Sequence, residues 1–487
     1  MKKFRRIAAV LMAAMMISAA ATGCSNGSTS SGAGSSDGGS SSGSSAAEGS
    51  SESQGGEESG EEYTVYFYAW TNEDNVKPLV EAFNEEYEGK YNLVYQKLND
   101  ASTMTINTAL ASGEQIDVMT QSSAIDLRQR ADSGTYLGLK QFMDQEGMDY
   151  AELFGESMEQ VQNIDGDYYS LPYCNNINVV WFNKNMFDEA GVEYPADDWT
   201  WDDFREKAKQ LTSGEGANKI YGAMMDFGGP SEGGGGDQYW MLIAQQKLGS
   251  FTYYTPDFTA TRFDAPEFKE SLQFFYDMVM GDQTVVPLSE YTTMKYQSDT
   301  NGMIGLYSGK YAMWVAPVYG CLYLNESYGE VPEGTDIGMA NLPRPVGATE
   351  NTSITYSSTA SIPANAPNPE ASWALLKYIC IDHPELFAGP KAMHPGIIYT
   401  DKEAEREMNE IIFGNHPGLD EEMALEVIEQ DRTLITKDNT HLEGQVKIND
   451  LIQADMALVF NGEMSVDDAL ADLKTKGDQY IQEDMAQ

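Results

Sequence analysis

From residue 63 onward, short apolar runs alternate with amphipathic segments whose apolar positions recur every three to four residues. The run 63–69 is apolar or aromatic on both faces, as expected for a central strand covered by helices. The predicted elements are strand 63–69, a helix with the face Val76, Val80, Phe83 and Tyr87, strand 91–95, helix 102–112 and strand 116–119. This βαβαβ order predicts a parallel sheet with right-handed crossovers.

Polar and aromatic side chains directly follow two of these strands. Trp70 and Asn72 come after the first strand, and Gln121 and Ser122 come after the strand at 116–119. In open α/β sheets, ligands bind beyond the carboxyl ends of the strands. The pattern therefore predicts that these four residues share one rim of the sheet.

The segment 171–211 reads as a strand that leaves one lobe and enters another, followed by two helices. Thr200 is the predicted N-cap of the second helix, and Asp203 stands in its first turn, where a carboxylate favours the helix dipole. Phe204, Ala208 and Leu211 then form one apolar face. Taken alone, this segment predicts no more than a buried α/β unit.

The remaining chain continues the alternation of strands and helices. Strands are predicted at 308–315 and 337–343, and the segment 353–362, rich in Ser, Thr and Tyr, is predicted to be a further link. Helices are predicted at 238–248, 268–280, 448–460, 465–480 and after Asn368, which is followed by a proline and an acid. The glycine-rich run 228–237 lacks the Lys-Ser/Thr ending of a phosphate loop. It is predicted to be a loop that leads into the helix carrying Trp240.

The amino terminus has the pattern of an export signal. A basic stretch (2–6) precedes an apolar region of 15 residues (7–21), too short for a membrane span. Ala21-Thr22-Gly23-Cys24 resembles the lipobox of bacterial lipoproteins, although Leu is usual where Ala21 stands. The resemblance implies a signal peptide over 1–23 and a lipid anchor on Cys24; cleavage as an ordinary secreted protein is the alternative.

Residues 24–62 consist almost entirely of Ser, Gly, Ala and acidic residues, which cannot form a core. They predict a disordered tether that spans roughly 35 Å root-mean-square. The whole chain has 30 Lys and Arg against 76 Asp and Glu, a net charge of −46. Such charge repels nucleic acid and anionic lipid, so neither is an expected partner.

Three cysteines remain beside Cys24, and their spacing is not that of metal ligands. Cys174, Cys321 and Cys380 are expected to be buried free thiols, with a Cys174–Cys321 disulfide as the alternative. The four histidines also lack the spacing of metal ligands (His383, His394, His416 and His441). No cofactor or metal is expected.

Taken together, residues 63–482 resemble the extracellular solute-binding proteins of sugar ABC transporters, of the maltose-binding-protein type. The resemblance is carried by Leu171-Pro172-Tyr173, Trp181-Phe182-Asn183-Lys184, Asp188-Glu189-Ala190-Gly191, Thr200-Trp201-Asp202-Asp203-Phe204, Gly309-Lys310-Tyr311-Ala312-Met313, Asn368-Pro369-Glu370-Ala371-Ser372-Trp373, the segments 109–113 and 117–118, and the tail 461–470. The resemblance implies an α/β, two-lobed periplasmic-binding-protein-like fold (type II). Each lobe would be a mostly parallel sheet flanked by helices.

The resemblance also implies a hinge of three crossings between the lobes, at 175–177, 355–360 and 396–399. The first lobe would comprise 63–174 and 361–395, and the second lobe 178–354 and 400–482. Hinge closure around a ligand is a known motion of this class of protein.

A sugar presents flat C–H faces and many hydroxyl groups, so its site should combine aromatic rings with polar partners. The ligand-binding candidates are Trp70, Asn72, Gln121, Ser122, Asn175, Asn176, Asp237, Trp240, Tyr319, Tyr356 and His394. Without the resemblance, a Trp or Tyr near a strand end is more often part of the core. Asn176 stands where maltodextrin receptors carry an acid, so the particular sugar stays open.

The expected function is capture of a neutral oligosaccharide by a lipid-anchored, extracellular, monomeric receptor that delivers it to the permease of an ABC importer. A peptide or polyamine receptor on the same fold is the nearer alternative. A tethered glycoside hydrolase is the further one, and the absence of Gly-x-Ser-x-Gly and His-Glu-x-x-His motifs gives no support to an enzyme.

Overall fold

The computed structural model describes residues 62–100, 102–121, 124–227, 239–296, 298–436 and 442–486. The predicted signal peptide, Cys24 and nearly all of the predicted tether lie outside these residues, as do Ser122, Asp237 and the glycine-rich run 228–237. None of the helices in the described part of the chain is long and apolar enough to cross a membrane.

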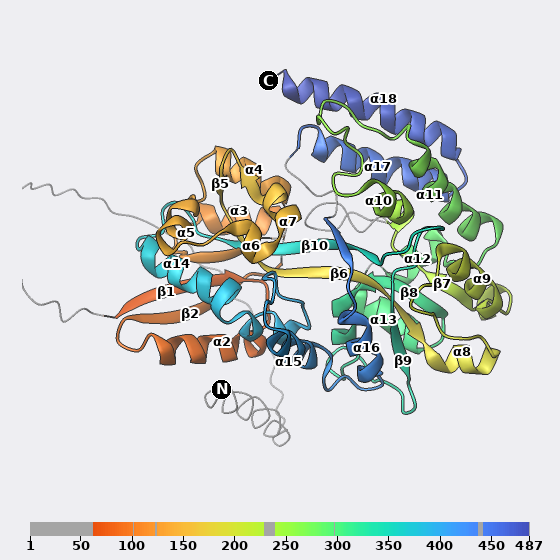
Figure 1. Cartoon of the computed structure of the whole chain (residues 1–487), viewed down its shortest axis with the longest axis horizontal. Coiled ribbons are helices and arrows are strands. Elements are labelled where there is room, and N and C mark those ends of the chain that lie inside the picture. Colours follow the sequence, from red (N-terminus) through yellow and green to blue (C-terminus); the bar gives the residue numbers. More distant parts are fainter. Residues whose placement is uncertain are drawn as a thin grey trace, which may run out of the picture. The chain divides into compact units, whose positions relative to one another are not determined.

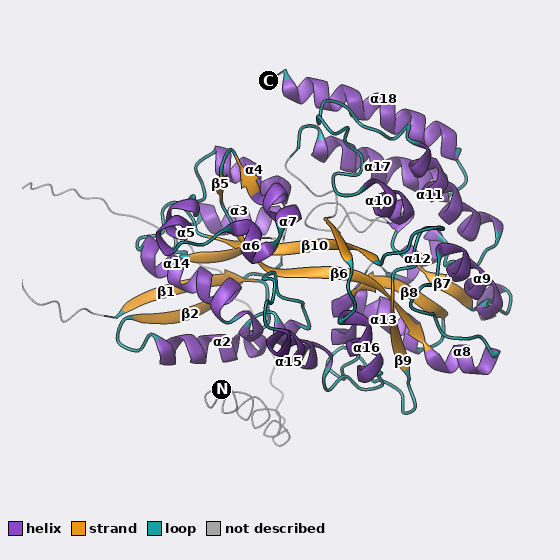
Figure 2. Cartoon of the chain, viewed as in Figure 1, coloured by secondary structure: helices purple, strands orange, loops and turns teal. Residues whose placement is uncertain are grey.

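Within the described residues, nine strands form one sheet in the order β2-β1-β3-β10-β6-β8-β7, with β11 beside β10 and β9 beside β6. Figures 1 and 2 show this sheet with helices around it. Its strands are β1 (Tyr63–Ala69), β2 (Tyr91–Lys97), β3 (Val118–Gln121), β6 (Leu171–Asn183), β7 (Tyr221–Met224), β8 (Tyr311–Pro317), β9 (Ile337–Asn341), β10 (Thr352–Ser361) and β11 (Thr433–Thr436). A separate pair consists of β4 (Asn163–Ile164) and β5 (Asp167–Tyr168).

The helices fill the segments between these strands. They are α2 (Glu73–Glu86), α3 (Thr103–Ala111), α4 (Ala124–Asp132), α5 (Lys140–Glu146), α6 (Tyr150–Phe154), α7 (Glu156–Gln162), α8 (Lys184–Ala190), α9 (Trp201–Leu211), α10 (Leu242–Leu248), α11 (Pro266–Tyr276), α12 (Leu288–Met294), α13 (Asp299–Tyr307), α14 (Pro369–Lys377), α15 (Lys402–Phe413), α16 (Glu421–Ile428), α17 (Gln445–Phe460) and α18 (Val466–Met485). The shorter turns are η1 (Gly216–Asn218), η2 (Tyr239–Met241), η3 (Asp277–Gly281), η4 (Val318–Tyr323), η5 (Tyr378–Asp382), η6 (Pro384–Leu386) and η7 (Gly389–Lys391). The prediction of a mixed α/β fold is confirmed.

Local sequence signals explain where several elements begin. Thr200 caps α9 through a full capping box with Asp203, and Asn368 accepts the amide of Ala371 at the start of α14. The strand predicted at 308–315 begins later, at Tyr311, because Gly309 adopts a left-handed conformation after α13. The helix predicted at 238–248 is also shorter, since its first described turn is the 3-10 turn η2.

Two long strands, β6 and β10, hold the sheet together. β1, β2 and β3 pair in parallel at one end, and β7 pairs in parallel with β8 at the other. The first half of β6 pairs with β10, whereas its second half pairs with β8 and β9. β6 therefore belongs to both halves of the sheet, as Figure 1 shows.

The place where β6 and β10 pass from one half of the sheet to the other, near 175–177, is called the crossing below. The buried apolar residues form separate clusters on its two sides. One cluster contains Val65, Leu171 and Cys174 with residues from α14 and η5, and a smaller one lies around Ile116. The largest cluster contains Val179, Trp181 and most of the buried apolar residues of the second half of the chain. This division is compatible with two lobes that meet near 175–177. The exact boundaries of the lobes stay a prediction.

A third segment lies against the free edge of β6 at the same level. The carbonyl of His394 accepts the amide of Asn175 at 2.9 Å. Gly396 lies so close to β6 that an added Cβ would stand 2.3 Å from the carbonyl oxygen of Pro172. Three stretches of chain thus run side by side where the two halves of the sheet meet.

This contact predicts that Gly396→Ala lowers the free energy of unfolding by about 1–3 kcal/mol, because the backbone must shift to admit the methyl group. Gly281→Ala is the matched control, since no heavy atom lies within 4 Å of the added Cβ there. Urea unfolding of both variants measures the difference. Equal stabilities would show that the segment does not pack tightly on β6.

Candidate functional site

The carboxyl ends of β3 and β11 point toward one another along the same edge of β10. β3 is antiparallel to β10, with Gln121 opposite Thr359, whereas β11 is parallel, with Thr436 opposite Thr355. Between these two positions, residues 356–358 of β10 have no strand partner on that edge among the described residues. One strand comes from each half of the sheet, so this interval is where a ligand could contact both halves.

A row of uncharged polar residues follows this interval on one face of the sheet. Directly paired residues of neighbouring strands place their side chains on the same face, as do alternate residues of one strand. The residues of this crossing row are Gln121, Thr359, Ser357, Thr355, Asn175 and Thr436. The row offers amide and hydroxyl groups and no charge, which suits a neutral ligand rich in hydroxyl groups.

Two atoms of the row are buried without a hydrogen-bond partner: Asn175 Oδ1 and Thr436 Oγ1. The backbones of both residues are fixed. The amide of Asn175 donates to His394, and the amide of Thr436 donates to Ser250 Oγ at 3.1 Å. Helix α7 contacts β11 and helix α10 contacts β10, so elements from both halves flank the row.

Gln121 is held in place by a buried cation. Arg130 on α4 is 5% exposed, and its Nη1 donates to Gln121 Oε1 at 2.9 Å. The same guanidinium donates to Asn107 Oδ1 at 2.9 Å and lies 3.5 Å from a carboxylate oxygen of Asp126. Because a guanidinium can only donate, it fixes Gln121 with its oxygen toward α4.

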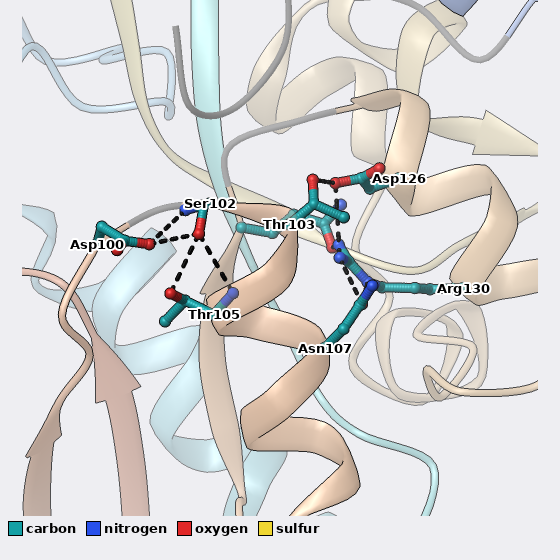
Figure 3. Close-up of polar contacts among 8 residues, drawn as sticks. Asp100, Ser102, Thr103, Thr105, Asn107, Asp126 and Arg130 are labelled. Atoms are coloured by element: carbon teal, nitrogen blue, oxygen red, sulfur yellow. Dashed lines mark hydrogen bonds and ion pairs between the residues drawn. The ribbon is translucent and has the colours of Figure 1, made fainter.

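Figure 3 shows how this network joins α3 to α4. Thr103 at the start of α3 donates its hydroxyl to Asp126, and Ser102 caps the same helix by accepting the amide of Thr105. These contacts hold the amino ends of the two helices beside the carboxyl end of β3. The first half of the sheet thus presents Gln121 on a rigid support.

Asn176, the neighbour of Asn175, faces the opposite side of β6 and is fully buried. Its Oδ1 accepts the amide of His394 at 3.3 Å, and its Nδ2 lies 3.4 Å from Cys174 Sγ. Burial lowers the pKa of His394, so its imidazole is neutral near pH 7. The structure therefore brings Asn175, Asn176 and His394 together, but Asn176 already has partners within the protein.

The side chain of Lys391 lies beside these residues at the crossing. It is buried, with Nζ 3.5 Å from the ring centre of Phe387 and 4.1 Å from that of Tyr173. Burial lowers the pKa of Lys391 to about 7, against the smaller opposite effect of the Cys174 and Cys380 thiols. The ammonium is thus held by cation–π contacts where water is excluded.

Among the remaining candidates, Trp70 and Asn72 do lie at the end of β1. Trp70 is partly buried and packs on the cluster around Ile116, and exposed Asn72 accepts a hydrogen bond from Lys97 Nζ at 2.7 Å. Gln121 is the last residue of β3 rather than part of the loop after it. The backbone of Tyr356 pairs with Asn176, and its side chain is outside the described part of the structure.

The two aromatic candidates of the second half differ. Trp240 has no exposed surface; its ring centre lies 6.1 Å from that of Phe268 inside the large cluster, so it occupies the core. Tyr319 is partly buried and follows the end of β8, whose Pro317 pairs with Asn178 at the crossing. Its hydroxyl lies 3.1 Å from Asp299 Oδ2.

Thr436, Thr355, Thr359, Ser357 and Arg130 were not among the residues singled out from the sequence. Short Ser and Thr runs are common in strands, and only the register across β3, β10, β6 and β11 puts these side chains in one row. The segment 433–436, Thr-Leu-Ile-Thr, does not alternate polar and apolar residues, so the sequence carries no strand signal there.

No group of His, Cys, Asp or Glu side chains in the described residues could hold a metal ion. Cys174, Cys321 and Cys380 are all buried and free, which confirms the expectation of free thiols and excludes the alternative Cys174–Cys321 disulfide in this structure. Burial raises the pKa of each thiol. The thiols are therefore protonated at neutral pH.

Residues 69–379 match the family described as bacterial extracellular solute-binding protein. The chain belongs to this family. Over 115 residues it is also 30% identical to an arabinooligosaccharide-binding protein of Halalkalibacterium halodurans, a match that covers 24% of this chain and 23% of that protein. The family and its relatives are binding proteins, consistent with the expectation of no enzyme.

Solved structures share the fold over nearly the whole chain. An ABC substrate-binding protein from Listeria monocytogenes in complex with cycloalternan aligns with a TM-score of 0.66 and 19% identity, covering 87% of this chain and 100% of that one. The sugar-binding protein MalE from Xanthomonas citri aligns with a TM-score of 0.63 and 17% identity, covering 86% and 98%. These alignments confirm the two-lobed fold.

The Arg130 network predicts different effects for two neighbouring arginines. Arg130→Lys should lower the free energy of unfolding by about 1–3 kcal/mol, because one ammonium lacks the planar fork with which the guanidinium reaches Gln121 and Asn107 together. Arg128→Lys, whose partners Asp132 and Asp165 are exposed, should change it by less than ~1 kcal/mol. Chemical denaturation tests both; similar losses would contradict the network.

Lys391 predicts a pH dependence. Its folded pKa of about 7 is below the ordinary 10.5, so burial of the charged amine opposes folding below about pH 7, and stability recovers as the pH rises toward 10.5. Lys391→Met should therefore gain up to a few kcal/mol relative to the native chain at pH 6.5 and less at pH 9.5. Unfolding at both pH values measures this, and a pH-independent difference would refute it.

Proposed function

We propose that the chain captures a neutral carbohydrate at the crossing row and delivers it to an ABC importer. The observation that carries the proposal is the row itself, six uncharged polar residues contributed by strands from both halves of the sheet. Hydroxyl and amide groups satisfy the many donors and acceptors of a sugar without burying an unpaired charge.

Aromatic residues at the ends of β1 and β8 complete this proposal. Trp70 and Tyr319 are each partly buried, so part of each ring is available to pack on a C–H face of a sugar. Asn72, Asn175, Asn176, Tyr356 and His394 remain proposed contributors around the crossing, and Gln121 is the first-lobe member of the row. Trp240 is not included, because it has no exposed surface.

The relatives support the ligand class. The Halalkalibacterium protein is described as binding arabinooligosaccharides, and the Listeria structure contains cycloalternan. A polyamine receptor would need carboxylates facing its ligand, and the crossing row has none. A peptide receptor has no specific observation in its favour.

Lipid attachment at Cys24 and an extracellular position on the cell membrane belong to the same proposal, supported by the signal-like residues 1–23. The receptor would be monomeric, with the membrane permease as its partner. Cys24→Ser would release the chain from the membrane fraction if the thiol is the anchor, and unchanged fractionation would exclude lipidation there.

A thermal-shift screen of residues 61–487 tests the ligand class. Arabinotriose, maltotriose, cycloalternan, tripeptides and spermidine are compared at equal concentrations. A carbohydrate at 100 times its dissociation constant should stabilise the fold by about 2.7 kcal/mol. Stabilisation by peptides or spermidine alone would refute the proposal, and release of product from any glycan would refute its non-enzymatic part.

A further inference from the structure

Thr436 is the member of the crossing row that comes from β11, and its hydroxyl makes no hydrogen bond to the described residues. The residue is 6% exposed, and Oγ1 has no hydrogen-bond partner among the described residues. Leaving such a group buried and unpaired costs about 1–3 kcal/mol. A valine of the same shape would avoid that cost.

A second unpaired atom lies on the same face. Asn175 Oδ1 is buried without a partner, and Asn175 is opposite Ser357 while Thr436 is opposite Thr355, two residues away along β10. Both backbones are fixed by hydrogen bonds to His394 and Ser250, so neither side chain can leave this face easily. Asn175 Oδ1 and Thr436 Oγ1 are therefore two fixed polar groups that a ligand could hydrogen-bond.

Thr436 and Gln121 stand at opposite ends of the unpaired interval of β10. The strand of Thr436 belongs to the second half of the sheet, and its carboxyl end faces Gln121, which α4 holds through Arg130 in the first half. A ligand in the interval beside residues 356–358 would meet a fixed polar group at each end. Thr436 can both donate and accept, as the hydroxyl of a sugar requires.

We propose that Thr436 is a ligand-contacting, specificity-determining residue that pairs with a hydroxyl group of the carbohydrate, with Asn175 Oδ1, on the opposite edge of β10, accepting a second hydroxyl. This inference rests on the proposed capture of a neutral carbohydrate and adds the residue from β11 that recognises it. The hydroxyl of Thr436 then contributes to binding and not to the stability of the free protein.

The test separates these two contributions with substitutions at a single position. Thr436→Val removes the hydroxyl and keeps the shape, Thr436→Ser keeps the hydroxyl, and Thr433→Val on the same strand is the control at an exposed position. Calorimetric titration with arabinotriose, maltotriose and cycloalternan gives the affinity, and thermal unfolding without sugar gives the stability.

Thr436→Val should weaken binding of the stabilising sugar about tenfold, the effect of one lost hydrogen bond, and leave the melting temperature of the free protein unchanged or higher. Thr436→Ser and Thr433→Val should bind within about threefold of the native chain. Asn175→Ala should weaken the same sugar and give a smaller additional loss when combined with Thr436→Val, if both contacts hold one ligand.

Native affinity in Thr436→Val would overturn the assignment while leaving carbohydrate capture intact. A melting temperature lowered as far as the affinity would also overturn it, because the hydroxyl would then be structural. Failure of the native chain to bind any of the three sugars, with a tripeptide or spermidine binding instead, would overturn the proposed function and this inference together.

Discussion

The pairing of β6 with β10 is the constraint on which the rest of the molecule depends. Each strand is long enough to pair with neighbours from both halves of the sheet, so separate apolar clusters share these two strands, whose ladder has one register shift between Ser358 and Thr359. Antiparallel hydrogen bonds at the crossing fix the register, and a slip of one residue would move every side chain to the other face. The position of the crossing row follows directly from this register.

The same pairing explains why the row is polar in a region that is otherwise apolar. Away from the crossing, β6 carries Val179, Val180 and Trp181, which are completely buried between helices. At the crossing, the row between the ends of β3 and β11 consists of Asn, Gln, Ser and Thr, and Ile177 opposite Thr355 is an aliphatic residue on the same face. Polar side chains there cost stability unless a partner satisfies them, and the unpaired Asn175 Oδ1 and Thr436 Oγ1 are the basis of the proposed ligand contacts.

Support for the row comes from residues that would not themselves touch a ligand. Arg130 holds Gln121 and joins α3 to α4, and Lys391 packs on Tyr173 and Phe387 behind the first crossing. Gly396 allows the third segment to approach β6 closely. These three contacts hold the residues around the crossing in place.

The sequence alone determined the class of fold, most strand and helix positions, the cap at Thr200 and the resemblance to sugar-binding receptors, because periodicity, capping and ordered motifs are local in the chain. It also indicated Gln121 and Asn175. Only the tertiary structure decided that Trp240 belongs to the core and that Thr436 stands beside Thr355, since burial and strand register arise from contacts between residues far apart in the chain. A tryptophan near a loop has the same local pattern in a core as in a binding site, and a four-residue strand does not specify its neighbour.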